Sequence, residues 1–422
     1  MENANGSCGS ASGVGTFNAP TANLCANGSS PSVNVGGENW TWTCAGTGNG
    51  TSATCTAPTC SGATCLFVVD GGNHRVAVYN TMGGYVGQFG QNDLHSPTGV
   101  TVDAQDTVWV MDTSYPASAP SSGGSDHLMG YRFNSTTGNY ALWNQIGTSG
   151  RLNGQLFAPF AVTTDSDNNI WVADSGNSRV EAYLGFGRTY TLGNGQTITY
   201  PSSSAGGVFE QIGGTASACG NSAGACACYN LPPYNTCPSN AGSGAGQMSW
   251  PSAIAIYPNG NLIVVDTFNN RVEVYGTVKS SPQSQFHDGA FLEQFGSNAL
   301  GFTSGSNEAS GVAVDSSGYI WVSDFNNNRL VQFNGGGTVL QETASTHLSN
   351  PEGIAFDPTN NVLWVVNFGS NIVTEFDLSG NFKATVGQSG AYGNNPAVDG
   401  LPTGVGGGYP GLLSPHGIAI GH

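Results

Sequence analysis

Six short segments of the chain begin with one variable residue, which is followed by glycine or alanine and then by an alternating apolar run. The variable residues are Thr98, Phe160, Ser252, Ser310, Glu352 and His416. Only Glu352 and His416 of this set are ionisable. A carboxylate and an imidazole brought together can form an ion pair, bind a metal weakly or contact a ligand. The six residues are therefore the candidate ligand-binding residues of the chain.

The sequence offers little for a catalytic metal or a nucleophile. A catalytic zinc ion needs three protein ligands, whereas only one of the six variable positions carries histidine. His95 and His347 precede their segments by several residues, so they would reach the variable residues only if their loops bent inward. A G-x-S-x-G nucleophile elbow is also missing. We therefore predict no metal ligand, no cofactor and no catalytic residue.

Four arginines recur at one position, five residues after an aspartate: Arg75, Arg179, Arg271 and Arg329. They could form a basic ring for an anionic ligand. However, each follows a turn rich in asparagine and small polar residues, where side chains bond the local structure. We interpret these arginines as structural parts of a repeat, and the repeated Trp109, Trp171, Trp321 and Trp364 as packing residues.

Ten cysteines fall into two even-numbered clusters, which favours disulfides formed in an oxidising compartment. The first cluster is Cys8, Cys25, Cys44, Cys55, Cys60 and Cys65, and the second is Cys219, Cys226, Cys228 and Cys237. Cys60 and Cys65 are predicted to form a local bridge, whereas three pairings remain open for the other four of the first cluster. Cys226 and Cys228 are too close in sequence to pair with each other. Zinc is the alternative for the second cluster.

The elements that must position these residues are repeated hairpins. An apolar run ending in aspartate, a polar turn and a second alternating run occur at 66–79, 170–183, 262–275 and 320–333, and in weaker form at 108–133 and 363–376. This pattern indicates two antiparallel strands. With the apolar segment before each hairpin and one further strand after it, each unit has four strands in about 40 to 50 residues, which is typical of the blades of a β-propeller.

The count of strands predicts how the ring closes. The hairpins end at Asp70, Asp112, Asp174, Asp266, Asp324 and Asn367, and the first of these six units lacks its inner strand. Residues 414–420 form an inner strand with no hairpin after it. We expect this C-terminal strand to complete the first blade and close an all-β propeller of six blades, formed by residues 66–422.

The repeats resemble the NHL family of six-bladed propellers. The resemblance rests on the Pro-x-Gly-Ile-Ala, Val-x-Asp and Asn-x-Arg-Val features of the units and covers nearly all of residues 66–422. It implies a fold rather than an activity, although some NHL relatives are lyases.

Residues 1–59 are predicted to form a separate small β domain, joined by a linker at 60–65. The segment is too short to be stable without disulfides. Its Cys8-Gly9, Trp40-Thr41-Trp42-Thr43-Cys44 and Ala53-Thr54-Cys55 features resemble a module that recurs in bacterial secreted and surface proteins. The resemblance implies an extracellular location but no activity.

Composition excludes several classes of function. The net charge is −17 with only 9 Lys plus Arg, which opposes nucleic-acid binding because phosphates are neutralised by cationic side chains. No apolar run approaches the roughly 20 residues that span a bilayer. The first residues, Met1-Glu2-Asn3, lack the features of a leader, so we expect that a leader has been removed from a protein destined for the exterior or the cell surface.

The composition, the repeats and the lack of catalytic motifs favour a non-enzymatic structural or binding protein. The six variable residues would stand at the mouth of the central channel of the propeller, and a lyase or hydrolase at this channel mouth is the alternative. A surface with few charges gives sheet edges little protection against pairing. We therefore expect a protein partner: another surface component, or a second copy whose propeller accepts the N-terminal domain and so builds a filament. A glycan is a further candidate partner.

Overall fold

The computed structural model of the chain describes residues 4–27, 31–60, 64–113, 126–151, 154–183, 185, 189–191, 197–199, 208–212, 242–276, 290–297, 299–300, 311–387 and 411–421. Regular structure in these ranges is β-strand, with short 3-10 turns between some strands. None of the helical turns in these ranges is long and apolar enough to span a membrane.

The repeated hairpin consists of two strands joined by a 3-10 turn. In the third unit, β16 (Ile170–Asp174) and β17 (Arg179–Tyr183) flank the turn Ser175–Asn177. Ser178 then adopts a left-handed φ of 53°, which asparagine and small polar residues tolerate best. Asn177 Nδ2 donates a hydrogen bond to Asp174 Oδ2 over 2.7 Å. The recurrent Asp and Asn of the motif thus build this turn.

The described strands form six four-stranded antiparallel sheets, numbered in chain order. Sheet one contains β33 (Pro415–Gly421), β6 (Cys65–Asp70), β7 (Arg75–Asn80) and β8 (Tyr85–Phe89), and sheet two contains β9 (Pro97–Val102), β10 (Val108–Asp112), β11 (His127–Asn134) and β12 (Asn139–Ile146). Sheet three contains β15 (Ala161–Thr164), β16, β17 and β20 (Val208–Ile212), and sheet four contains β21 (Pro251–Ile256), β22 (Leu262–Asp266), β23 (Arg271–Gly276) and β24 (Ala290–Phe295). Sheet five contains β25 (Val312–Val314), β26 (Ile320–Asp324), β27 (Arg329–Phe333) and β28 (Val339–Ala344), and sheet six contains β29 (Pro351–Asp357), β30 (Val362–Asn367), β31 (Ile372–Asp377) and β32 (Phe382–Val386).

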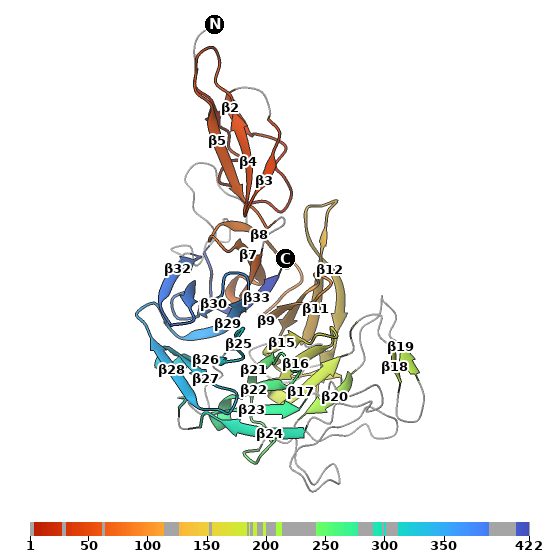
Figure 1. Ribbon diagram of the computed structural model, residues 1–422. Coiled ribbons are helices and arrows are strands. Elements are labelled where there is room, and N and C mark those ends of the chain that lie inside the picture. The colour runs from red at the N-terminus through yellow and green to blue at the C-terminus, as the bar shows by residue number, and fades with distance from the viewer. Residues whose placement is uncertain are drawn as a thin grey trace.

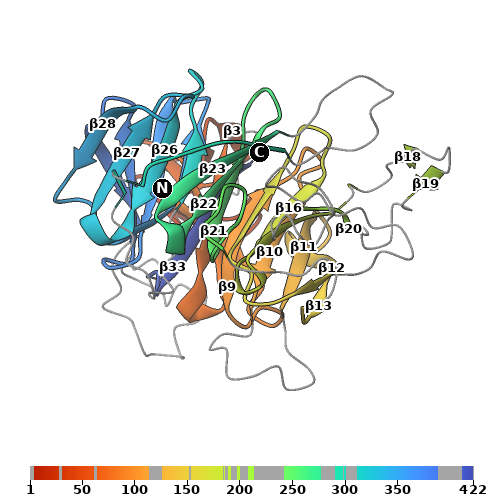
Figure 2. The same ribbon diagram turned by 90° about the horizontal axis from the view of Figure 1, so that it is seen from below.

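The two ends of the repeat region meet in sheet one. β33 lies antiparallel to β6, with Ile418 opposite Val68 and Ala419 opposite Phe67. β33 also contacts the first strands of the two neighbouring sheets, β9 and β29. The predicted pairing of the C-terminal strand with the first hairpin is therefore confirmed, and Figures 1 and 2 show this strand among the other first strands.

Neighbouring sheets pack face to face through apolar side chains. Trp364 of sheet six belongs to one cluster with Leu66 and Val68 of sheet one, and Trp109 of sheet two belongs to one with Ile170 and Val172 of sheet three. Each of these side chains is buried. The repeated tryptophans therefore pack between sheets, as predicted.

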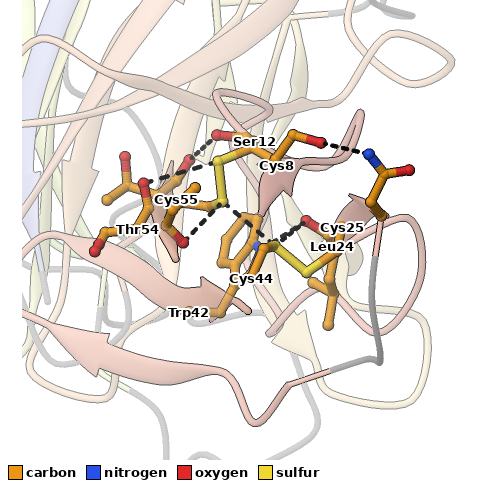
Figure 3. Close-up of a disulfide and its surroundings, with 12 residues drawn as sticks. Cys8, Ser12, Leu24, Cys25, Trp42, Cys44, Thr54 and Cys55 are labelled. Carbon is orange, nitrogen blue, oxygen red and sulfur yellow. Dashed lines mark hydrogen bonds between the residues drawn. A yellow bond between two sulfur atoms is a disulfide. The ribbon is translucent and has the colours of Figure 1, made fainter. Parts of the chain in front are cut away.

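The N-terminal residues form a three-stranded sheet of β3 (Asn34–Gly36), β4 (Asn39–Cys44) and β5 (Ala53–Pro58), and a short pair of β1 (Ser7–Cys8) and β2 (Cys25–Asn27). Disulfides join Cys8 to Cys55 and Cys25 to Cys44 (Figure 3). Trp42 packs beside them, and its Nε1 donates to the Leu24 carbonyl over 2.7 Å. Cys60 is bonded to Cys65, as predicted. Cys219, Cys226, Cys228 and Cys237 lie outside the described residues.

The N-terminal strands rest on sheets one and two of the same chain (Figure 1). Phe17 packs with its ring centroid 5.8 Å from that of Phe133 and 5.5 Å from that of Tyr140. Asn80 Nδ2 donates to the Glu38 carbonyl over 2.8 Å. The segment that carries the disulfides is thus attached to the sheets by an aromatic cluster and by polar bonds.

In sheets one to four, a buried aspartate ties the hairpin to the segment that leads into the first strand of the same sheet. Asp174 accepts hydrogen bonds from the Phe157 backbone N–H at 2.7 Å and from Arg179 Nε at 2.8 Å. Arg179 also pairs with Glu181 at 3.0 Å, and all three side chains are at most 1% exposed. Equivalent pairs join Asp70 to Arg75, Asp266 to Arg271 and Asp324 to Arg329. The arginines are structural, as predicted.

Replacing Arg179 with alanine should lower the free energy of unfolding by about 3–5 kcal/mol, because Asp174 and Glu181 would remain in a dry site without their counter-charge. Arg329→Ala is the matched control. Its partner Asp324 is buried too, but the Arg329 side chain is 21% exposed and its second partner Glu342 is 48% exposed. Water can therefore reach the vacated site, and the loss should be smaller, about 2 kcal/mol. Urea unfolding of both variants measures the difference, and equal losses would contradict this account.

Candidate functional site

The six predicted positions stand at the start of the first strands. Thr98, Ser252, Glu352 and His416 lie in β9, β21, β29 and β33, and Phe160 directly precedes β15. Ser310 lies outside the described residues. The first strands contact one another in succession, from β33 to β9, β15, β21, β25 and β29. The described members therefore come together at one end of these strands, at the place we call the mouth.

Close approach of the first strands explains the glycine that follows most of the variable residues. A Cβ added to Gly417 would lie 2.8 Å from the Thr98 carbonyl oxygen, and one added to Gly353 would lie 2.4 Å from that of His416. Gly99 and Gly311 face the carbonyls of Phe160 and Glu352 in the same way, at 2.6 and 2.2 Å. Because a side chain there would separate the strands, glycine fixes the spacing of the mouth.

Glu352 and His416 form a pair at the mouth. His416 Nδ1 lies 2.7 Å from Glu352 Oε1, and the two side chains are 23% and 6% exposed. Burial by itself lowers the pKa of an imidazole, but the negative charges of Glu352 and Asp70 and the hydrogen bond to Glu352 outweigh it, so the pKa of His416 is raised above its usual 6.5. The pair therefore favours a charged imidazolium beside a carboxylate.

The hydroxyl groups of the mouth are already bonded within the fold. Thr98 Oγ1 donates to the Pro159 carbonyl of the next sheet over 3.1 Å, and Ser252 Oγ bonds Thr267 Oγ1. Both residues are buried. They help to hold neighbouring segments together. Glu352 is buried as well, so of the predicted residues that the structure describes, Phe160 and His416 have the more accessible side chains.

Aromatic side chains, which the sequence analysis missed, surround these residues. Trp250 lies between Phe160 and Phe268, with ring centroids 6.2 and 5.5 Å away. Phe368 lies between Phe325 and His416, at 6.0 and 5.4 Å. Phe268, Phe325 and Phe368 follow the hairpin Asp or Asn by one or two residues, and Trp250 precedes the proline of β21. An aromatic residue at either position of the repeat is the signal that could have identified them.

The other histidines considered as metal ligands have partners elsewhere. His95 Nδ1 lies 3.2 Å from Asp112 Oδ2, and the His347 ring stacks on Phe382 with centroids 3.7 Å apart. Across the described ranges, no group of three or more His, Cys, Asp or Glu residues could hold a metal ion. The mouth as described offers an ion pair and aromatic rings for contact with a ligand.

The six four-stranded sheets, whose first strands contact one another in succession, place the chain in the class of β-propeller proteins. Residues 307–333 match the family model of the NHL repeat, which confirms the resemblance for that unit. A search of curated proteins gave no match.

Several solved structures are similar to this chain at low sequence identity. A chain of the nidogen/laminin complex is 14% identical, with a TM-score of 0.47, over 85% of this chain and 98% of its own length. A putative 6-phosphogluconolactonase from Bacteroides fragilis is 11% identical, with a TM-score of 0.47, over 86% and 100%. Virginiamycin B lyase from Staphylococcus aureus is 15% identical, with a TM-score of 0.37, over 68% of each chain.

Replacing Glu352 with glutamine should lower the pKa of His416, since the carboxylate is the main group that raises it. Because the pKa of His416 is raised in the folded state, the stabilisation that it gives is complete below the unfolded value of about 6.5 and disappears as the pH rises through the folded value. NMR titration of the His416 ring checks the shift. Ser252→Ala, a variant in a non-adjacent strand of the mouth, should leave the titration unchanged; an unchanged midpoint in Glu352→Gln would refute the coupling.

Proposed function

We propose that the protein is an extracellular or cell-surface structural and binding protein, without catalytic activity, whose propeller is a rigid platform for protein contacts. One observation carries this proposal: apolar side chains are exposed on sheet edges in two separate parts of the molecule. Val35 in β3 is 48% exposed, and Leu292 in β24 and Leu340 in β28 are 51% and 47% exposed. Exposed apolar residues gathered at an edge are typical of interaction surfaces.

In this proposal the platform is a six-bladed propeller formed by residues 66–422 and closed by β33. A disulfide-stapled domain, residues 1–59, precedes it, and residues 60–65 are the linker. Support comes from the pairing of β33 with β6 and from its contacts with β9 and β29. The Leu413 backbone N–H also donates to Asp70 Oδ1 over 2.7 Å, so the C-terminal segment completes the aspartate site of sheet one.

Removal of residues 411–422 should lower the melting temperature by more than about 10 °C, because the buried Leu412 and Ile418 leave the cluster that joins sheets one and six. Thermal unfolding followed by circular dichroism measures the change. Leu340→Ala is the control, since that side chain is largely exposed and its loss should change the melting temperature little. A truncated chain that melts like the full-length protein would refute closure.

The extracellular location is supported by the three disulfides of the described residues. Such bonds persist in oxidising compartments and are rare in the cytosol. Two of them join strands of the N-terminal sheet region, where the small apolar cluster around Trp40 and Trp42 would otherwise have to hold the fold alone.

The partner that we propose is a second copy of the chain. β3 is an edge strand of the N-terminal sheet, and Val35 projects from it. On sheets four and five, Phe295, Phe333 and Val339 line an open pocket of about 370 Å³, and Val339 is 37% exposed. An apolar edge that fits a pocket elsewhere on the molecule makes a heterologous contact, which propagates into a filament unless the rotation closes it.

Light scattering of the full-length protein should show a mass that rises with concentration, and either Val35→Lys or Val339→Lys should abolish the rise. Each variant keeps one intact half of the contact, so an equimolar mixture should form dimers and stop there. Leu142→Lys, at a similarly exposed position on the outer strand of sheet two, is the matched control and should assemble like the wild type. A wild-type protein that stays monomeric at all concentrations would refute self-assembly.

The mouth is proposed as a second contact site of the platform. Thr98, Phe160, Ser252, Ser310, Glu352 and His416 were identified from the sequence, and Trp250 and Phe368 add half-buried rings. Aromatic rings provide large apolar contact areas, and the Glu352–His416 pair can exchange hydrogen bonds with a polypeptide. These features suit a peptide segment of a protein partner.

A lyase or hydrolase is the alternative function, and the Glu352–His416 pair is the observation that favours it. A histidine held by a carboxylate can transfer a proton to or from a bound substrate. The test is turnover of a panel of esters and lactones by the wild type and by His416→Asn. Activity that is present in the first and lost in the second would favour the enzyme over the platform.

A further inference from the structure

An open pocket of about 510 Å³ lies between the N-terminal sheet region and sheet six. Glu38 of the N-terminal region forms one side, and Asn361, Trp364, Glu375 and Lys383 of sheet six form another. Asn361 follows the end of β29, whereas Glu352 stands at its start. The pocket is therefore at the opposite end of the first strands from the mouth, and a ligand bound in it would be independent of the platform function.

In three other sheets, the equivalent tryptophan donates a hydrogen bond within its own sheet. Trp109 Nε1 donates to Asp103 Oδ2 over 2.9 Å, Trp171 Nε1 to Asp165 Oδ2 over 3.1 Å, and Trp321 Nε1 to Asp315 Oδ2 over 2.9 Å. The aspartate closes the turn after the first strand, and the tryptophan follows it by six residues in each case. The repeat thus supplies its own acceptor for the indole.

Sheet six has one more residue in this turn. Trp364 follows Asp357 by seven residues, and Asp357 Oδ2 accepts from Asn360 Nδ2 over 2.8 Å. Trp364 is only 1% exposed, and its Nε1 has no hydrogen-bond partner in the part of the chain that the structure describes. A buried N–H without an acceptor is unfavourable. Trp364 is one of the residues that line the pocket, so the wall of the pocket contains a donor that lacks an acceptor within the described fold.

The neighbouring strand carries a carboxylate on the same face of sheet six. Glu375 lies directly opposite Trp364 in the pairing of β31 with β30, so the two side chains share one face of the sheet. Burial raises the pKa of Glu375; Lys383 opposes this rise and Asp357 adds to it. Because burial disfavours its charged form, the Glu375 carboxylate is stabilised by a neutral hydrogen-bond donor.

The other acidic groups of the pocket are used within the fold. Glu38 accepts hydrogen bonds from the Thr81 hydroxyl and, over 2.9 Å, from the Met82 backbone N–H. Asp377 accepts from Ser379 and Asn381 of its own turn and lies 3.8 Å from Lys383 Nζ. Trp364 and Glu375 are therefore the groups most directly suited to a ligand.

We propose that this pocket binds a neutral saccharide of one or two sugar units, with a hydroxyl group bridging Trp364 Nε1 and Glu375. A hydroxyl oxygen accepts from the indole N–H while its proton is donated to the carboxylate. A cation would leave the indole without an acceptor, and an anion would be repelled by Glu375. The volume is within the range of small-molecule sites, and a bound sugar would contact both the N-terminal region and sheet six.

The test is NMR of the full-length, ¹⁵N-labelled protein titrated with glucose, galactose, N-acetylglucosamine, maltose and lactose. The indole N–H signal of Trp364, assigned from its absence in Trp364→Phe, should shift with at least one of these sugars at concentrations up to about 10 mM. Trp364→Phe keeps an aromatic ring and removes the donor, so it should weaken binding of that sugar by about tenfold.

Trp321→Phe is the matched control. It removes an indole N–H that Asp315 accepts within sheet five, so it should destabilise the protein but leave sugar binding unchanged. Trp364→Phe should also destabilise the protein, because the smaller ring leaves a cavity in the buried cluster between sheets one and six, so sugar binding of both variants is compared at a temperature where both are folded. Failure of every sugar to shift the Trp364 signal, or equal binding by Trp364→Phe and the wild type, would overturn the proposal and indicate a pocket filled by water only.

Discussion

The architecture depends on one buried carboxyl group repeated around the molecule. At the end of the second strand of a sheet, this group accepts a backbone N–H from the segment that enters the first strand: Phe157 for Asp174, Ser249 for Asp266, and Leu413 for Asp70. The same carboxyl accepts from the arginine that starts the third strand. One side chain thus fixes the turn, the entry of the first strand and the pairing of the second with the third.

This interaction specifies geometry more than it adds stability. Burial raises the pKa of Asp70, Asp174 and Asp266 in spite of the neighbouring arginines. The cost of removing the carboxylate from water therefore exceeds what the arginine returns, as is common for buried ion pairs. Apolar packing between sheets must supply the stability, and the tryptophans of sheets two, three, five and six provide much of the buried surface.

The sequence could predict the features that recur from one repeat to the next or follow from a count of the strands. The hairpins, the structural arginines, the local Cys60–Cys65 bridge and the pairing of β33 with β6 follow from repeats and from a count of strands. The contact of Glu352 with His416 was one of the expected arrangements, because adjacent first strands bring equivalent positions together. Periodicity fixes the place of a residue in its sheet and therefore its neighbours in the next one.

Features without a period could not be predicted. Four cysteines in a single small unit allow three pairings, and the choice of Cys8–Cys55 and Cys25–Cys44 depends on how β1 to β5 fold. The position of Phe17 against Phe133 and Tyr140 depends on a contact between segments that share no repeat. The Cys219 to Cys237 cluster and Ser310 lie outside the described residues, so those predictions stay predictions.

The repeated bonds shape the sheets, and the positions at which the repeat changes give this chain its own surface features. At the mouth, identical backbone positions carry different side chains, because the glycine or alanine beside them maintains the strand spacing whatever the variable residue is. At the opposite end, one added residue in the turn after β29 separates Asp357 from Trp364 and leaves a donor in a pocket. Since the repeated bonds already hold each sheet, such local changes alter what the surface can bind without a change of fold.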